Sequence, residues 1–222
     1  KLLAWNNAQA DQLTFIDSTV TESVDPYSKA VTVNGQRSVV VDLDKTNPEG
    51  WGKRMAPFPS ASEAVIYEMH VRDFTVSSNS GMLQRGKFLG VAEEGTVNPN
   101  GSATGIDYLQ ELGVTHVELL PIFDFQTVDE TNEKPKQYNW GYDPQNFNAP
   151  EGSYATDPYD PFCRIIELKK MIQALHDAGI RVIMDVVFNH VYEVESHSFH
   201  KTVPGYFFRY NDKGEFTSGT GV

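Results

Sequence analysis

The chain has 222 residues, of which 40% are hydrophobic, so it is long enough for one sizeable domain or for parts of two. Its formal net charge of −12 argues against nucleic acids and anionic membranes as partners, because binding to phosphate groups depends on a basic surface. A neutral polysaccharide fits this charge better. We expect no membrane span and no signal peptide, because the sequence contains neither a long enough apolar run nor a signal-like N-terminus.

The first part of the chain, residues 1–44, alternates runs typical of β-strands with turn signals. Asn34-Gly35 lies between two β-branched runs and predicts a hairpin. We interpret this part as a β-sandwich remnant or an edge hairpin, too small to be stable alone. Residues 45–62 are rich in proline, glycine and charge, with Trp51 in their middle, and are typical of a linker.

From residue 63 onward the pattern changes to alternating strands and helices, which indicates a parallel α/β arrangement. The first strand is predicted at 64–71. A helix at 104–112 is stopped by Gly113, and a second strand follows at 114–121. The polar, glycine-rich residues between the first strand and this helix, 81–101, are predicted to be a mobile surface loop without a chemical role.

A second helix is predicted to begin after Asp160, which can cap its first turn, with Pro161 at the first helical position. Gly179 ends this helix before the third strand. Its inner stripe is predicted to contain Ile165, Leu168, Ile172 and Leu175. Cys163, the single cysteine, lies in the same pattern and predicts a buried thiol; one unpaired cysteine also favours a cytoplasmic protein over a secreted one.

The residues between the second strand and the second helix, 122–159, form an insert that is far longer than the usual connection. Long loops at this position shape a binding cleft, so we expect a functional role for the insert.

The third predicted strand, RVIMDVVFNH at 181–190, is an apolar run that ends in polar residues. It is typical of a buried parallel strand in which Asp185 and Asn189 share one face, with His190 where the strand opens into its loop. In an α/β barrel this carboxyl end is where chemistry occurs. The alternative is a core strand whose last residues cap a turn.

Three segments, in this order, resemble the type I pullulanases, which are debranching enzymes of the α-amylase family of glycoside hydrolases. They are VIYEMHVRDFT at 65–75, YNWGYDP at 138–144 and DVVFNH at 185–190. YNWGYDP is a hallmark of that subfamily, whereas DVVFNH is shared across the wider family. The resemblance implies that 63–222 is the first part of a (β/α)8 TIM barrel, with about three strands, preceded by the end of a β-sandwich carbohydrate-binding-like module that includes VDPYSKAVTVNG at 24–35.

A barrel closes with eight strands, so three strands leave an open edge and part of a core exposed. We expect the chain to be unstable alone and to be completed by the remainder of the same enzyme. Retaining cleavage needs two carboxyl groups about 5 Å apart, one as nucleophile and one as acid. The resemblance implies that both lie on the absent strands, so no catalytic residue is assigned to this chain.

The resemblance implies instead that the chain recognises the sugar at the cleavage point. His190 is expected to hydrogen-bond a sugar hydroxyl, and Tyr142 to stack on the same sugar. Asp185 is expected to be a supporting carboxylate. Tyr138 and Trp140 are either further stacking platforms or, for Trp140, a ring buried beneath the loop.

No metal site is predicted. Asn189 helps to hold a calcium ion or a loop in many relatives, but one amide without a carboxylate cluster is a weak signal for calcium. His197 and His200 are three residues apart, and they lack the nearby carboxylates typical of a metal site. Four ionisable residues at the end of the first strand are interpreted as a support for the barrel: Glu68, His70, Arg72 and Asp73.

The resemblance implies part of an enzyme that cleaves α-1,6-glucosidic branch linkages in pullulan, glycogen or limit dextrins with retention. Its expected partners are the branched α-glucan and the rest of the enzyme, with no nucleic acid and no membrane. Two alternatives stay open. One is another activity of the same family, α-1,4 cleavage or transglycosylation, and the other is a non-catalytic glycan-binding fragment.

Overall fold

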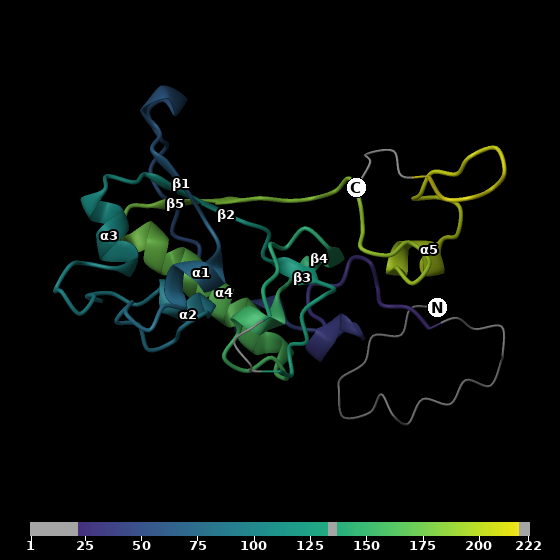
Figure 1. Cartoon of the computed structure of the whole chain (residues 1–222), viewed down its shortest axis with the longest axis horizontal. Helices are drawn as coiled ribbons and strands as arrows, with labels where there is room; N and C mark the ends of the chain where they lie inside the picture. The colour runs from purple at the N-terminus through teal and green to yellow at the C-terminus, as the bar shows by residue number, and fades with distance from the viewer. Residues whose placement is uncertain (1–21, 133–136, 218–222) are drawn as a thin grey trace.

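The computed structural model describes residues 22–132 and 137–217 (Figure 1). The strands of this part of the chain are β1 Ile66–Met69, β2 His116–Leu119, β3 Phe123–Phe125, β4 Pro144–Pro150 and β5 Arg181–Met184. The α-helices are α1 Val71–Thr75, α2 Phe88–Val91, α3 Gly105–Glu111, α4 Pro161–Asp177 and α5 Ser198–Thr202. Short 3-10 helices lie at Val33–Gly35, Leu43–Thr46, Ala61–Glu63 and Gly152–Tyr154.

The three predicted strands form one parallel sheet in the order β1-β2-β5 (Figure 1). Glu68 of β1 is paired with Glu118 of β2, and Glu118 is paired with Ile183 of β5. Strands that are consecutive in this sheet are joined through helices, which is the arrangement of a parallel α/β unit. The prediction of three parallel strands from a barrel-like pattern is therefore confirmed.

The long helix α4 forms where the sequence predicts it. The Asp160 carboxylate accepts the amide hydrogen of Phe162, and Pro161 occupies the first turn, where no intrahelical N–H bond is needed. After the helix, Gly179 adopts φ +84°, a left-handed conformation that disfavours residues with a side chain. These local signals fix α4 between the long insert and β5.

The buried side of α4 differs from the predicted stripe. Ile165 and Leu175 are buried as expected, but Met171 is fully buried where Ile172 was expected to be. Arg164 and Glu167 are also buried on this helix. The N-terminal half of the helix therefore buries both charged residues and the apolar Ile165, whereas its C-terminal half faces an apolar interior.

The main apolar core lies between the sheet and the helices on one side of it (Figure 1). Its members include Val117 and Leu119 from β2, and Met171 and Leu175 from α4. The residues 81–101 contribute to this core through α2, where Phe88 is fully buried. The prediction of a mobile surface loop was therefore wrong, because this short apolar helix packs against α4.

The N-terminal segment forms a small hairpin but no extended strand within residues 22–44. A single antiparallel bridge joins Val31 and Ser38, and the Val39 amide donates to the Ala30 carbonyl at 2.9 Å. The β-sandwich interpretation stays a prediction, and residues 1–21 lie outside the described residues.

The third strand is shorter and more exposed than its apolar sequence predicts. β5 ends at Met184, so Asp185 and Asn189 do not share one strand face. Phe188 is 72% exposed, and Met184 and Val186 are also exposed. Within the described residues β2 is the one strand that pairs with β5, so its other edge is open, and the prediction of a buried strand is not met for this side of the sheet.

The long insert contains an antiparallel pair, β3 and β4, that the sequence did not predict. We call this pair the β3–β4 ribbon. Asp124 pairs with Asn146, and Phe125 pairs with Pro144, with shifts in register between the pairs. Within the described ranges, no helix combines the length and apolar character needed to cross a membrane.

Candidate functional site

Two of the predicted site residues meet above the sheet because their segments end there. Tyr142 lies two residues before β4 begins, and Asp185 directly follows β5. The Tyr142 hydroxyl donates a hydrogen bond to Asp185 Oδ2 at 2.5 Å. The carboxyl end of β5 and the start of the ribbon are therefore joined by one short, charge-assisted bond.

His190 completes this contact from the loop after β5. Its Nε2 lies 2.6 Å from the Tyr142 carbonyl oxygen, so Nε2 donates the hydrogen. The amide of Asn189 donates to His190 Nδ1 at 2.9 Å. Both ring nitrogens are thus occupied, and Asn189 orients the imidazole.

The phenol of Tyr142 is held in its protonated form. Desolvation is the largest cause that raises its pKa to about 12, followed by the hydrogen bond with Asp185 and the negative charges of Asp185, Glu68 and Glu118. Glu68 and Glu118 are partners in the register of β1 and β2. A phenol among carboxylates acts as a hydrogen-bond donor, and here it donates to Asp185.

Tyr138 and Trp140 are exposed rings in the same loop. Trp140 is 60% exposed, which rules out the interpretation of a ring buried beneath the loop. The two rings meet edge to face with centroids 6.3 Å apart, and Tyr138 also lies over His70 at 5.1 Å. His70 Nε2 lies 2.8 Å from the Asn139 carbonyl oxygen, so His70 supports the loop between the two rings.

The four ionisable residues near the end of β1 divide into two groups. Arg72 and Asp73 form an ion pair at 2.9 Å, and His70 accepts the Asp73 amide at Nδ1. Burial lowers the pKa of His70. These three residues contact one another, whereas Glu68 belongs to the carboxylates around Tyr142, and a supporting role for the barrel stays a prediction.

The remaining sequence candidates have packing partners. His197 is buried against the rings of Phe147 and Phe199, and desolvation lowers its pKa to about 4. His200 packs against Phe216. Cys163 is half-buried rather than buried, and partial burial raises the pKa of its thiol.

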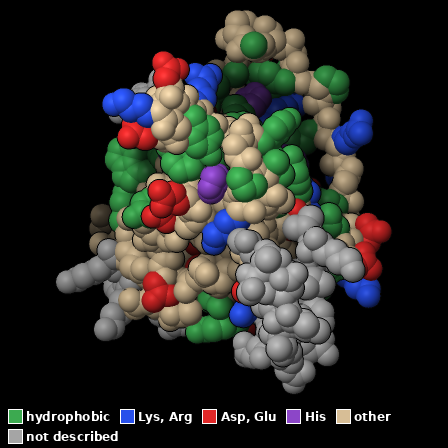
Figure 2. All heavy atoms as spheres, turned by 90° about the vertical axis from the view of Figure 1, so that its right-hand side faces the viewer, with side chains coloured by type: hydrophobic (Ala, Val, Ile, Leu, Met, Phe, Trp, Pro, Cys, Tyr) green, Lys and Arg blue, Asp and Glu red, His purple; other side chains and the backbone are tan. Residues whose placement is uncertain are grey.

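The face formed by the C-terminal segment is rich in exposed rings. Figure 2 shows hydrophobic side chains spread over this face with a histidine among them. Phe199 and Phe207 stack with centroids 4.4 Å apart, and Tyr206 and Phe188 are largely exposed.

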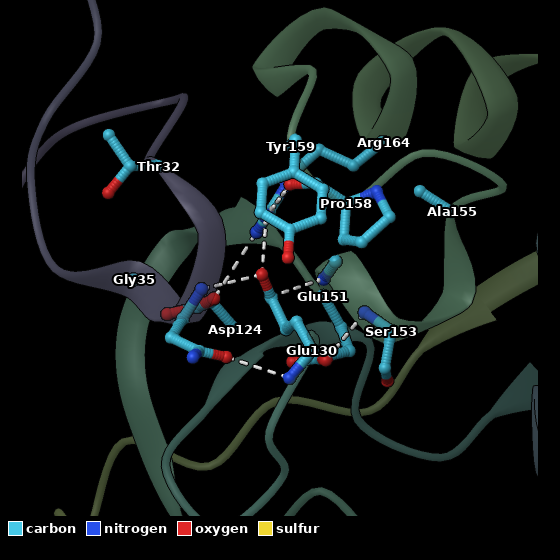
Figure 3. A network of polar contacts seen from close by, with 12 residues as sticks. Thr32, Gly35, Asp124, Glu130, Glu151, Ser153, Ala155, Pro158, Tyr159 and Arg164 are labelled. Carbon is cyan, nitrogen blue, oxygen red and sulfur yellow. Dashed lines mark hydrogen bonds and ion pairs between the residues drawn. The ribbon is translucent and has the colours of Figure 1, made fainter. Parts of the chain in front are cut away.

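A buried ion cluster below the ribbon was missed by the sequence reasoning (Figure 3). Arg164 is 0% exposed, and its guanidinium donates to Glu130 Oε2 at 2.8 Å and to Asp124 Oδ1 at 3.3 Å. Glu151 accepts amide hydrogens from Ser153 and Phe125. We call these four side chains, Asp124, Glu130, Glu151 and Arg164, the Arg164 cluster.

The three carboxylates of the Arg164 cluster place one ligand atom each within 4.8 Å of one another, which is a spacing that a cation could use. The guanidinium of Arg164 already contacts two of them, so the cluster is an internal ion network. Three buried acids face one cation, and burial raises the pKa of Asp124 well above its ordinary value. The sequence contains one sign of a buried charge. Arg164 lies one helical turn before Leu168, on the side of α4 predicted to be apolar.

The buried carboxyl of Glu151 is expected to make the stability of the protein depend on pH. Complete burial, and then the neighbouring Glu130 carboxylate, raise the pKa of Glu151 to about 7. The stability that its proton confers is present below the ordinary pKa of 4.5 and is lost as pH rises through about 7. We expect Glu151→Gln to remove this dependence, which amounts to at most about 3 kcal/mol between about pH 5 and about pH 8. Urea denaturation across this range measures it.

The matched control is Glu167→Gln, which changes another buried carboxyl, on α4, that binds Thr156 instead of the cluster. This variant should keep the pH dependence of the parent protein. Parallel stability curves for Glu151→Gln and the parent would show that Glu151 holds no extra proton.

Gly141 sets the direction in which the chain enters Tyr142. It adopts φ +92°, and a Cβ atom there would lie 2.5 Å from the carbonyl oxygen of Pro121. We expect Gly141→Ala to cost about 1 to 3 kcal/mol of stability and to shift Tyr142 away from Asp185. Thermal melting, with a phenol titration of Tyr142, checks both effects; Gly95→Ala, where a Cβ meets nothing within 4 Å, is the control for positive φ alone.

Comparisons with known proteins identify a family and several relatives that the chain resembles. Residues 68–214 match the family described as "Alpha amylase, catalytic domain". The chain is 55% identical to a pullulanase of Bacillus subtilis (strain 168) over 202 residues, which are 90% of this chain and 27% of that protein. It is 35% identical to pullulanase 1, chloroplastic, of Arabidopsis thaliana, covering 89% of this chain and 24% of that protein.

Solved structures are similar over the same part. Pullulanase from Paenibacillus barengoltzii in complex with maltohexaose and alpha-cyclodextrin has a TM-score of 0.87 at 55% identity, over 89% of this chain and 31% of that chain. Pullulanase of Anoxybacillus sp. LM18-11 complexed with maltotriose has a TM-score of 0.85 at 56% identity, over 90% of this chain and 28% of that chain. This chain therefore spans about a quarter to a third of the length of these relatives.

Proposed function

Because the chain belongs to the alpha-amylase family, we propose that it forms part of an enzyme that cleaves α-1,6-glucosidic branch linkages with retention. One observation carries this proposal: Tyr142 of the YNWGYDP segment is bound to Asp185 and His190 of the DVVFNH segment. The first segment is specific to debranching enzymes and the second to the wider family. The two segments contact each other at the carboxyl end of β5, and the active sites of α/β barrels lie at the carboxyl ends of their strands.

Tyr142 offers a ring face to the sugar at the cleavage point, with its hydroxyl tied to Asp185. Asp185 thereby acts on the sugar through Tyr142, as a supporting carboxylate. Aromatic rings bind sugars by covering the apolar face of the pyranose, and a fixed ring loses little conformational freedom on binding.

His190 contributes a polar contact on the same side. Because Nε2 and Nδ1 already have partners, a sugar hydroxyl has to replace the Tyr142 carbonyl or the Asn189 amide. Replacement of one polar partner by another keeps the imidazole satisfied, so the exchange costs little. Asn189 then orients His190 for the sugar; its contact here is with the imidazole.

Tyr138 and Trp140 extend the site along the loop. Their exposed rings stand edge to face and are free to cover further glucose units of a branched chain. The complexes of the relatives with maltohexaose and maltotriose support an α-glucan as the ligand.

The nucleophile and the acid lie on the strands of the barrel that follow β5. Barrel closure requires eight strands, and the open edge of β5 is where the next strand pairs. The remainder of the same enzyme is therefore the partner of this surface. In this division 1–44 ends a β-sandwich module, 45–62 links it to the barrel, and 63–222 begins the barrel.

Linkage-defined oligosaccharides test the proposal. The full-length protein that carries this sequence is incubated with a branched oligosaccharide containing one α-1,6 bond and with a linear α-1,4 oligosaccharide of equal length. We expect release of the branch with an α-anomeric product and no cleavage of the linear sugar. Cleavage of the linear sugar, or transfer instead of hydrolysis, would assign a different activity of the family.

A further inference from the structure

The turn at Asn34 and Gly35 enters the Arg164 cluster from the N-terminal segment (Figure 3). The Asn34 amide donates to Glu130 Oε2 at 2.7 Å, and the Glu130 amide donates to Asn34 Oδ1 at 2.7 Å. The Asn34 side chain also donates to Asp129 at 3.2 Å. Two segments that are about a hundred residues apart in sequence are thus joined by a reciprocal pair of bonds.

Gly35 lets this turn approach the ribbon closely. Its φ is +65°, and a Cβ atom there would lie 2.3 Å from Asp124 Oδ2. Its carbonyl oxygen accepts a hydrogen bond from the Asn146 amide at 3.1 Å. Residue 35 therefore has to be glycine for the turn to seat against both ribbon strands.

The contacts continue from the turn to Tyr142. Asn146 of β4 donates to Asp124 of β3 at 2.6 Å, which ties the two ribbon strands together beside Gly35. The Gln126 amide donates to the Asp143 carbonyl at 3.0 Å, next to Tyr142. The position of the Tyr142 ring thus depends on how the ribbon is held.

The carboxylates of the Arg164 cluster need hydrogen-bond donors in addition to one guanidinium, and the turn supplies one of them. Arg164 is the cation that contacts Asp124 and Glu130, and Glu151 adds a third carboxyl beside them. Glu130 therefore relies on neutral N–H donors, from Asn34 and from Gly152 at 2.9 Å, in addition to Arg164.

We propose that Asn34 is a positioning residue for the substrate site: it closes the Arg164 cluster, holds the β3–β4 ribbon and thereby fixes Tyr142. The inference rests on the proposed function for its effect on substrate. The segment before the barrel then takes part in sugar binding without touching the sugar.

Asn34→Gly in the full-length protein is the test, because glycine keeps the left-handed turn (φ +57° at Asn34) and removes only the two side-chain bonds. The matched control is Asn148→Ala. Asn148 also joins the N-terminal segment to β4 through two side-chain bonds, to Pro26 and Lys29, but it lies outside the cluster.

Two readouts separate a positioning role from a merely structural one. Amide hydrogen exchange of residues 123–130 and 142–152 should become about 5- to 10-fold faster in Asn34→Gly, with β1 and β2 unchanged. The lost bond to the Glu130 amide contributes a factor of about five, and the exposed bond to Asp129 contributes a factor of at most about two. KM for pullulan should rise by a similar factor, with kcat within about twofold. Asn148→Ala should leave both readouts at the parent values.

Unchanged exchange at the ribbon in Asn34→Gly, or equal changes in the two variants, would overturn the inference. Faster exchange with unchanged KM would overturn the link to the sugar site. A parent protein that is inactive on α-1,6 linkages would contradict the proposed function instead, and the exchange of 142–152 would still decide whether Asn34 positions Tyr142.

Discussion

Arg164→Met is expected to lower the free energy of unfolding by about 3 to 5 kcal/mol. The guanidinium is fully buried and contacts Asp124 and Glu130, with Glu151 beside them. Methionine fills similar space but removes the guanidinium from beside three buried acids. Urea denaturation of the full-length protein near neutral pH measures the loss.

A second variant tests whether the loss of stability comes from uncompensated charge. Adding Asp124→Asn and Glu130→Gln to Arg164→Met removes the uncompensated charges and should restore much of the lost stability. Arg181→Met is the matched control, because Arg181 is half-buried and donates to one carbonyl, that of Ala56. A loss below about 1 kcal/mol in Arg164→Met would show that the carboxyl groups are satisfied without the guanidinium.

Tyr142→Ala is expected to reduce kcat/KM on pullulan about 100-fold. Loss of a ring that covers the sugar removes about 2 to 3 kcal/mol of apolar burial, which corresponds to that factor. Tyr142→Phe keeps the ring and removes the donor to Asp185, so a smaller loss of about 10-fold is expected. Initial rates over a range of pullulan concentrations measure both variants.

Tyr108→Ala is the control for aromatic truncation, because Tyr108 lies on α3, away from the carboxyl end of the sheet. It should keep the activity of the parent. Activity of Tyr142→Ala within about threefold of the parent would contradict the assignment of Tyr142 to the sugar site.

The bounds of α4 could be predicted from the sequence, because they depend on residues at the helix ends. Asp160, Pro161 and Gly179 mark both ends of α4, and the structure uses each of them for a cap, a first turn and a left-handed stop. Two motifs predicted that Tyr142 and His190 lie at the same sugar. They did not predict the partners of the imidazole, because a backbone carbonyl and a neighbouring side-chain amide occupy its two nitrogens.

Features that depend on distant partners were missed. Strand β4 begins and ends with proline, and its register against β3 shifts. The sequence therefore shows no alternation of apolar and polar residues that would mark the ribbon. The Arg164 cluster joins side chains from β3, the insert and α4, and no spacing in the sequence links them. β5 was predicted to be buried from its apolar run, but burial depends on a neighbour across its open edge.

The most direct test of the proposed division of labour is reducing-end release from pullulan by the purified 222-residue chain, alone and mixed with a polypeptide that supplies the remaining barrel strands. The mass of every polypeptide in the active fraction is recorded. We expect no release by the chain alone and release by the mixture. Release by the chain alone would contradict the assignment of the nucleophile and the acid to strands outside this sequence.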